Sequence, residues 1–129
     1  MKPSSPFVTE RARIKGLGSA KSGTKHFLHE RISGVALIPL TFLFVITLLT
    51  LSGADYARAV ATLKNPFFGL TVLAFLIAGA YHMKLGMQVI IEDYAHGGAK
   101  MVLLFVNTFF TVAVALASAL AVLKLSFGA

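Results

Sequence analysis

The stretch that decides the fold is ISGVALIPLTFLFVITLLTLSGA, residues 32–54, which contains no formally charged side chain. The hydrocarbon core of a bilayer is about 30 Å thick, and a helix needs ~20 apolar residues to cross it. This stretch is therefore long enough to span a membrane. Two further runs meet that length or come close to it: residues 65–91, interrupted by His82 and Lys84, and residues 101–123.

The composition agrees with a chain that lies mostly in lipid. Of its 129 residues, 57% are hydrophobic and 13% are charged, which is too apolar for the surface of a water-soluble domain of this size. We therefore predict an all-α integral membrane protein with three transmembrane helices, over about residues 24–52, 65–94 and 99–125. Residues 1–23 are expected to form a basic cytoplasmic segment, and residues 24–129 the membrane anchor domain. No room remains for a soluble domain.

Positive charge is concentrated before the first span. The formal net charge is +7, and seven of the twelve basic residues lie in the first 31 positions: Lys2, Arg11, Arg13, Lys15, Lys21, Lys25 and Arg31. Such a cluster beside a span is the positive-inside signal and is attracted to anionic cytoplasmic lipid. We favour this interpretation over a nucleic-acid-binding arm. The N-terminus should face the cytoplasm, and three crossings then place Ala129 outside.

Targeting signals and the lack of cysteine bear on the membrane in which the chain lies and on the metal ligands that it can offer. The first 31 residues lack the apolar core of a signal peptide, so the chain is expected to insert uncleaved. The absence of a transit peptide favours a bacterial inner membrane over a mitochondrial inner membrane. The chain has no cysteine, so any metal must rely on histidine, carboxylate or methionine ligands. Any iron–sulfur chemistry must then belong to a partner.

Local signals predict how the spans begin, bend and connect. Pro39 inside the first span predicts a kink. Asn65 and Pro66 suit the cap and the first position of the second helix. Residues 53–64 are expected to form a short outer loop, and residues 95–100 a tight inner turn that returns the chain antiparallel.

One face of the second span carries the ionisable side chains. At 100° per residue, His82, Gly86, Val89 and Asp93 fall within about 60° of one another and form one stripe. The helical rise places His82 roughly 16 Å below Asp93, near mid-bilayer, whereas Asp93 and Tyr94 reach the cytoplasmic headgroups. Ionisable residues inside a membrane helix are costly, so they are functional candidates by default.

The stripe allows two interpretations of His82. Gly86, one turn away, removes a side chain where a flat group or a second helix would approach, and a neutral imidazole is a good axial ligand for haem iron. Alternatively, His82 is bonded to a neighbouring helix, because a buried imidazole needs a polar partner. The spacing alone leaves both interpretations open.

The string HMKLGMQVIIEDY, residues 82–94, resembles a family signature. The signature is H-x-x-x-G-x-x-x-(I/V)-(I/L)-x-D-Y, found in the hydrophobic membrane-anchor (D-type) subunits of succinate dehydrogenase, respiratory complex II. Every fixed position of the signature is met. The three spans, the basic N-terminal segment and the pattern Gly23-x-x-x-Phe27-x-x-x-Arg31 also fit this family. The resemblance extends over essentially the whole chain, but only residues 82–94 are specific.

The resemblance implies cofactors, partners and a role for each site residue. His82 would be an axial ligand of the iron of haem b, and the second ligand would come from a C-type cytochrome b anchor subunit. Tyr94 would hydrogen-bond a carbonyl oxygen of ubiquinone, and Asp93 would tune that position and its proton supply. Arg31 would lie near the haem propionates and the quinone. A flavoprotein subunit and an iron–sulfur subunit would dock on the inner face.

Elementary chemistry agrees with these implied roles. A phenol such as that of Tyr94 can polarise a quinone carbonyl, and the Asp93 carboxylate can relay protons. Arg31 can pair with a propionate or can merely add to the positive-inside charge. The function implied is electron transport from succinate to ubiquinone in the tricarboxylic acid cycle, with no independent activity of this subunit. Alternatives are the anchor of a quinol:fumarate reductase and a cofactor-free structural or assembly subunit of another membrane complex.

Other polar residues are expected to have less specific roles. His26 and His29 are three positions apart, and we expect interfacial polar contacts rather than a metal site from them. His96 should be solvated in the inner turn, although it lies close enough to Asp93 in sequence to join a proton path. Asn107 is expected to bond to a neighbouring helix. Lys84 is expected to extend toward the interface or to face a partner subunit.

Overall fold

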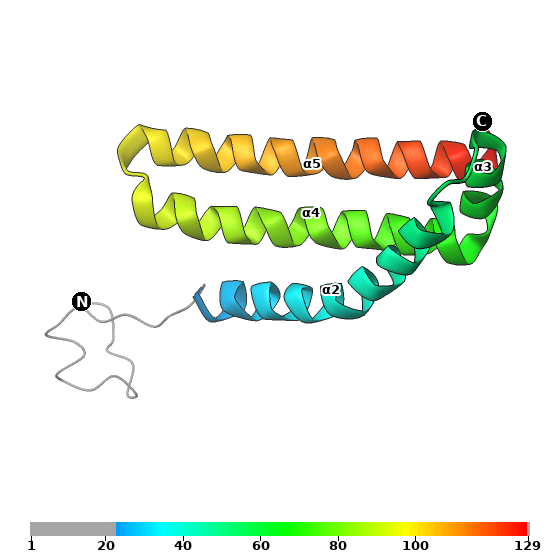
Figure 1. Cartoon of the computed structure of the whole chain (residues 1–129). Coiled ribbons are helices and arrows are strands. Elements are labelled where there is room, and N and C mark those ends of the chain that lie inside the picture. The colour runs from blue at the N-terminus through cyan, green and yellow to red at the C-terminus, as the bar shows by residue number, and fades with distance from the viewer. Residues whose placement is uncertain (1–22, 129) are drawn as a thin grey trace, which may run out of the picture.

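The computed structural model describes residues 23–128, and all of its regular structure is helical. The elements are α2 (Gly23–Leu51), α3 (Tyr56–Lys64), α4 (Pro66–Tyr94) and α5 (Gly97–Phe127), shown in Figure 1. Three of them, α2, α4 and α5, are long and apolar enough to cross a membrane. The prediction of an all-α chain is confirmed for these residues, and three helices have the length and apolar character predicted for membrane spans. Most of the basic N-terminal segment lies outside the described residues.

The long helices form an open row with α4 in the middle. Figure 1 shows α4 between α2 and α5, and α4 packs against both of them. Within residues 23–128, the backbones of α2 and α5 do not approach each other. Because the connections are short, neighbouring long helices run antiparallel. This arrangement leaves both flanks of α4 partly open.

The start of α4 follows the local sequence signal. The Asn65 side chain accepts a hydrogen bond from the Phe67 backbone N–H at 3.0 Å, and Pro66 occupies the first helical position. The cap satisfies one of the free N–H groups at the helix start, and proline has no N–H to satisfy there. The prediction for Asn65 and Pro66 is therefore confirmed.

The outer connection contains a helix that the sequence analysis did not predict. The expectation of a loop over residues 53–64 is wrong for α3, which occupies Tyr56–Lys64. The Asp55 carboxylate caps α3 by accepting from the Arg58 N–H at 2.9 Å. Gly53 has a φ of +72° and forms a turn directly after the end of α2. The turn does not extend to residue 64. The nine residues of α3 are mostly good helix formers, although they are too few for a clear periodic pattern.

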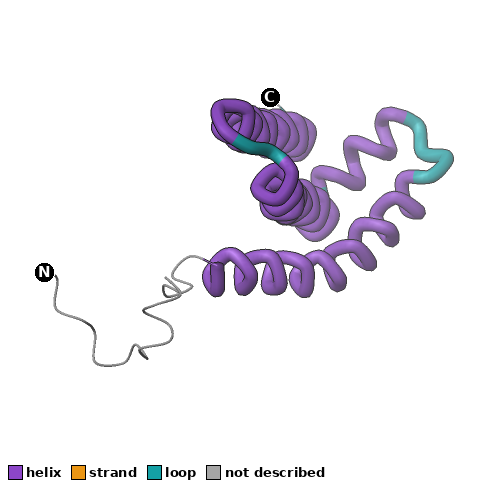
Figure 2. Tube along the Cα trace, turned by 90° about the vertical axis from the view of Figure 1, so that its left-hand side faces the viewer, coloured by secondary structure: helices purple, strands orange, loops and turns teal. Residues whose placement is uncertain are grey.

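The first span is bent. Figures 1 and 2 show that α2 changes direction about half-way along its length, and Pro39 is the proline inside this helix. Proline lacks the N–H that would bond to the preceding turn, and its ring crowds that turn. The bend agrees with the kink predicted at Pro39.

Contacts between the helices rely on small and polar side chains. Few hydrophobic side chains are buried within residues 23–128, namely Ala80, Leu85, Ile91 and Val122. The buried polar side chains are Ser33, Thr47, Thr71, Asn107 and Thr111. The three threonine hydroxyls donate to carbonyls four residues earlier in their own helices, so they are buried without an unmet hydrogen bond. Small residues let helices approach closely in lipid, while many large apolar side chains remain exposed on the outside.

The end of α3 packs closely against α4 and α5, and this contact is called the α3 corner below. The Ser126 hydroxyl of α5 donates to the Leu63 carbonyl of α3 at 2.9 Å. Gly69 of α4 is buried at the same point, where an added Cβ would lie 2.7 Å from the Leu63 carbonyl oxygen and 3.0 Å from Ser126 Oγ. Only a glycine therefore fits at position 69 without moving α3.

Candidate functional site

His82 lies on the face of α4 that packs against α2. Its Nδ1 is 2.9 Å from the hydroxyl oxygen of Ser33, a side chain that is only 8% exposed. The Ser33 hydroxyl donates its one hydrogen to the Glu30 carbonyl, 3.0 Å away in the preceding turn of α2. When the Ser33 hydroxyl donates to Glu30, its oxygen accepts from His82 Nδ1–H, and a neutral imidazole then has its lone pair on Nε2.

His82 Nε2 makes no hydrogen bond among residues 23–128 and is not fully buried there. Among the side-chain nitrogen and oxygen atoms of these residues, the one that is both buried and without a hydrogen-bond partner is His26 Nε2. A Cβ added to Gly34 would lie 3.3 Å from His82 Cε1, the ring carbon between the two nitrogens. The imidazole therefore packs closely against the α2 backbone along its Nδ1–Cε1 edge.

Space for a flat group lies next to His82. Gly86 is half-buried, and a Cβ added to it would have nothing within 4 Å among the described residues. A histidine can be an axial ligand of haem iron, and the glycine leaves room for a flat group beside it. No group of three or more histidine, cysteine or acidic side chains close enough to hold a metal is found between residues 23 and 128. These residues are compatible with one side of a haem site.

Asp93 and Tyr94 end the stripe at the last turn of α4. Both side chains are exposed, Tyr94 to 82%, and neither makes a side-chain hydrogen bond within the part of the chain that the structure describes. Lys100 of α5 instead donates to the Glu92 carbonyl at 3.1 Å, which fixes the turn that follows α4. The phenol and the carboxylate thus project from a defined helix end, but this chain does not enclose them.

Arg31 lies apart from the other predicted site residues. Its guanidinium carbon is 4.8 Å from the centre of the Phe27 ring, a cation–π contact one turn along the same helix. Position 31 is about 200° around the helix from Ser33, so Arg31 projects away from α4. Within residues 23–128, the structure records no hydrogen bond or ion pair that joins Arg31 to the stripe on α4.

A polar hollow lies between the start of α2 and the second half of α4. It has a volume of about 380 Å³ and is lined by Gly23, Lys25, His26, His29, Tyr81, Lys84, Leu85, Gln88 and Glu92. The Tyr81 hydroxyl is 2.7 Å from His29 Nδ1 and makes a second hydrogen bond between α2 and α4. The expected polar contact of His29 is thus present. Asn107 Nδ2 donates to the Lys84 carbonyl at 3.0 Å, which confirms the expectation that Asn107 bonds to a neighbouring helix.

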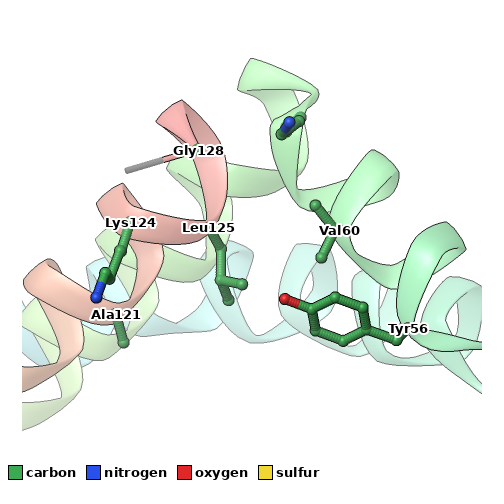
Figure 3. A pocket seen from close by; sticks show the side chains of 7 residues that line it. Tyr56, Val60, Ala121, Lys124, Leu125 and Gly128 are labelled. Carbon is green, nitrogen blue, oxygen red and sulfur yellow. The ribbon is translucent and has the colours of Figure 1, made fainter.

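Another hollow lies at the far end of the helices from Tyr94. It has a volume of about 540 Å³ and lies between α3 and the end of α5. Figure 3 shows the Tyr56 ring extending from α3 toward Leu125 of α5, with Val60 above it. This hollow is open and contains none of the predicted site residues, so it is not associated with the chemistry of the stripe.

The residues that contact His82 from α2 could not be identified from the sequence. Ser33 and Gly34 were not singled out, although they form the first small pair inside the first apolar run. A small polar residue next to a glycine in a span is a signal for close helix contact. The sequence contains no signal for which residue of another helix they contact.

Comparisons with known proteins agree on one family. Residues 5–123 match the model of the succinate dehydrogenase/fumarate reductase transmembrane subunit. The chain is 33% identical over 123 residues to the succinate dehydrogenase hydrophobic membrane anchor subunit of Paracoccus denitrificans, covering 95% of each chain. It is 36% identical over 88 residues to the subunit of the same name from Rickettsia bellii, covering 68% of this chain and 70% of the relative.

No solved structure matches the chain. The signature at the end of α4, the three spanning helices and matches over nearly the whole length lead to one conclusion. This chain belongs to the family of succinate dehydrogenase/fumarate reductase transmembrane subunits.

Proposed function

We propose that the chain is the D-type membrane anchor of a succinate:quinone oxidoreductase, that it co-ligates haem b through His82, and that it forms part of the ubiquinone site. The observation that carries the proposal is the Ser33–His82 hydrogen bond, which uses Nδ1 and leaves Nε2 for a metal, together with the open space at Gly86. When bound, haem b supplies a one-electron redox centre. A C-type partner subunit would provide the second ligand.

The direction of electron flow is proposed from the relatives. The relatives from Paracoccus denitrificans and Rickettsia bellii are both named as succinate dehydrogenase anchors, although the family model also includes fumarate reductase subunits. We therefore favour transfer from succinate to ubiquinone over the reverse reaction. This chain is expected to have no activity without its partners.

The proposed assembly follows from charge and exposed surface. The N-terminal basic segment, residues 1–23, would face the cytoplasm of a bacterial inner membrane, and residues 24–129 would form the anchor domain. The large apolar side chains on the outside of α2, α4 and α5 would be covered by lipid and by the C-type subunit. The flavoprotein and iron–sulfur subunits would dock where Tyr94 ends α4.

In the proposed quinone site, Tyr94 and Asp93 have separate tasks. The Tyr94 phenol donates a hydrogen bond to a quinone carbonyl oxygen, which becomes more negative on reduction. The neighbouring Asp93 carboxylate passes on the protons that quinol formation consumes. Because both side chains are exposed, the partner subunits would supply the remaining walls. Arg31, on another face, would pair with a haem propionate or lie near the quinone.

The quinone role is tested with Tyr94→Phe in the assembled complex. Removing the donor should slow transfer from succinate to ubiquinone about tenfold or more, because an interaction with developing charge is lost. Oxidation of succinate by an artificial acceptor should remain unchanged. Tyr56→Phe is the matched control, since Tyr56 is also exposed but lies at the opposite ends of the helices. An equal loss of both activities indicates failed assembly, and an unchanged quinone rate contradicts the proposal.

The cofactor-free alternative is tested by purification. A tag on this chain should copurify a second anchor subunit, a flavoprotein and an iron–sulfur protein, together with b-type absorbance in a reduced-minus-oxidised spectrum. A complex of other composition without that absorbance would support a structural or assembly subunit instead.

A further inference from the structure

Two hydrogen bonds join α2 to α4 at adjacent positions of α4. Tyr81 bonds to His29 at 2.7 Å, and His82 bonds to Ser33 at 2.9 Å. The two bonds hold the same pair of helices together at nearly the same height in the membrane. Only the second bond involves the proposed haem ligand. Removing each bond in turn therefore separates an effect on helix packing from an effect on the haem ligand.

The hydrogen bonds of the Ser33 hydroxyl bear on which nitrogen of His82 carries the proton. A serine hydroxyl has one hydrogen to donate, and that of Ser33 is directed to the Glu30 carbonyl at 3.0 Å. Its oxygen then accepts from His82 Nδ1–H. If Ser33 instead donated to Nδ1, the imidazole proton would lie on Nε2, and Nε2 would have no lone pair for a metal.

Gly34 complements Ser33 by allowing the ring to lie close to α2. The Cβ that any other residue would add at position 34 would be 3.3 Å from His82 Cε1 and 3.9 Å from Nδ1. These distances show that the ring edge rests against the backbone of α2. The hydroxyl of Ser33 and the missing side chain of Gly34 together restrict both the protonation and the orientation of the imidazole.

From this geometry we infer that Ser33 is a positioning residue that fixes the Nδ1–H tautomer of His82 and so presents Nε2 as the haem ligand. The inference rests on the proposed function and deepens it. Hydrogen-bonding partners of metal-bound histidines set the ring orientation and increase ligand basicity, and their loss typically weakens metal affinity 10- to 100-fold. A more basic ligand favours the oxidised iron, so Ser33 also lowers the reduction potential of the haem.

The test compares Ser33→Ala with Tyr81→Phe in the complete complex. Ser33→Ala should reduce haem retention during dilution or competition at least tenfold and should shift the midpoint potential to more positive values. A tenfold change in the ratio of affinities for the two oxidation states corresponds to ~59 mV for a one-electron couple. Tyr81→Phe, which removes the neighbouring bond, should change neither quantity. Ser33→Thr retains a hydroxyl and should restore both.

A second variant covers the case in which Ser33→Ala does not assemble. Ser33→Cys has a similar volume but only a weak acceptor, so it should shift the potential in the same direction as alanine. Equal effects of the Ser33 and Tyr81 variants, or an unchanged haem in Ser33→Ala and Ser33→Cys, would overturn the inference.

His82→Ala separates failure of this inference from failure of the proposed function. If His82→Ala loses the haem absorbance while Ser33→Ala keeps the wild-type potential and retention, only the inference about Ser33 is wrong. If His82→Ala retains a normal haem, the proposed ligand itself is wrong, and the role of Ser33 falls with it.

Discussion

Replacing Gly69 by alanine should open the α3 corner. The added Cβ would lie 2.7 Å from the Leu63 carbonyl oxygen, whereas carbon–oxygen contacts in proteins are normally about 3.3–3.6 Å. The overlap is therefore roughly 0.6 Å or more. Because the contact is with backbone, no side-chain rotation relieves it. Moving the carbonyl would also stretch the 2.9 Å hydrogen bond from Ser126.

The expected cost combines two effects. Overpacking a tight contact typically destabilises a protein by about 1–3 kcal/mol, and a lost hydrogen bond adds about 1 kcal/mol. Gly69→Ala should therefore cost about 2–4 kcal/mol. The matched control is Gly79→Ala in the same helix, where an added Cβ would meet nothing within 4 Å in the described part of the chain. Alanine is the better helix former, so this control should be neutral or slightly stabilising.

The assay is thermal denaturation of the purified complex in detergent, monitored by loss of the intact assembly on size-exclusion chromatography. Gly69→Ala should dissociate at a clearly lower temperature than both wild type and Gly79→Ala. Because Gly69 is far from the stripe on α4, the haem spectrum of the intact fraction should be normal. Equal stability of the two alanine variants would refute the close packing at the α3 corner.

Three further predictions concern the helix contacts and the site. Asn107→Leu should destabilise the α4–α5 contact by about 0.6–1.7 kcal/mol, measured by the same denaturation assay, since it removes the bond to the Lys84 carbonyl. Gly34→Ala should displace the His82 ring by a few tenths of an ångström and alter the electron paramagnetic resonance signature of the haem, whereas Gly79→Ala should leave it unchanged. Asp93→Asn should slow ubiquinone reduction about tenfold or more while the haem spectrum stays normal.

Much of the fold could be predicted because the bilayer constrains it. A span needs a fixed apolar length, so three runs of that length predicted α2, α4 and α5. The start of α4 was predictable because Asn65 and Pro66 act on neighbouring residues alone. The short helix α3 was missed because turn signals precede it and because two and a half turns contain too few residues to show a period.

The site was predictable only where it lies on one helix. Helical geometry alone relates His82, Gly86 and Asp93, so their common stripe could be calculated from their spacing. The partnership of Ser33 with His82 depends on the register between two helices, which no local pattern specifies. Arg31 was suggested by the family resemblance, and the contact that the structure gives it, with Phe27, lies within α2 itself.

Haem ligation by His82 is tested most directly by the reduced-minus-oxidised spectrum of the complex that contains His82→Ala. His29→Ala is the matched control, since His29 also bonds across the α2–α4 interface but lies outside the stripe. Assembly is verified by succinate oxidation with an artificial acceptor. If His82 ligates the haem, the b-type absorbance is lost or strongly altered in His82→Ala and retained in His29→Ala. An unaltered b-type spectrum in a fully assembled His82→Ala complex would contradict this ligation.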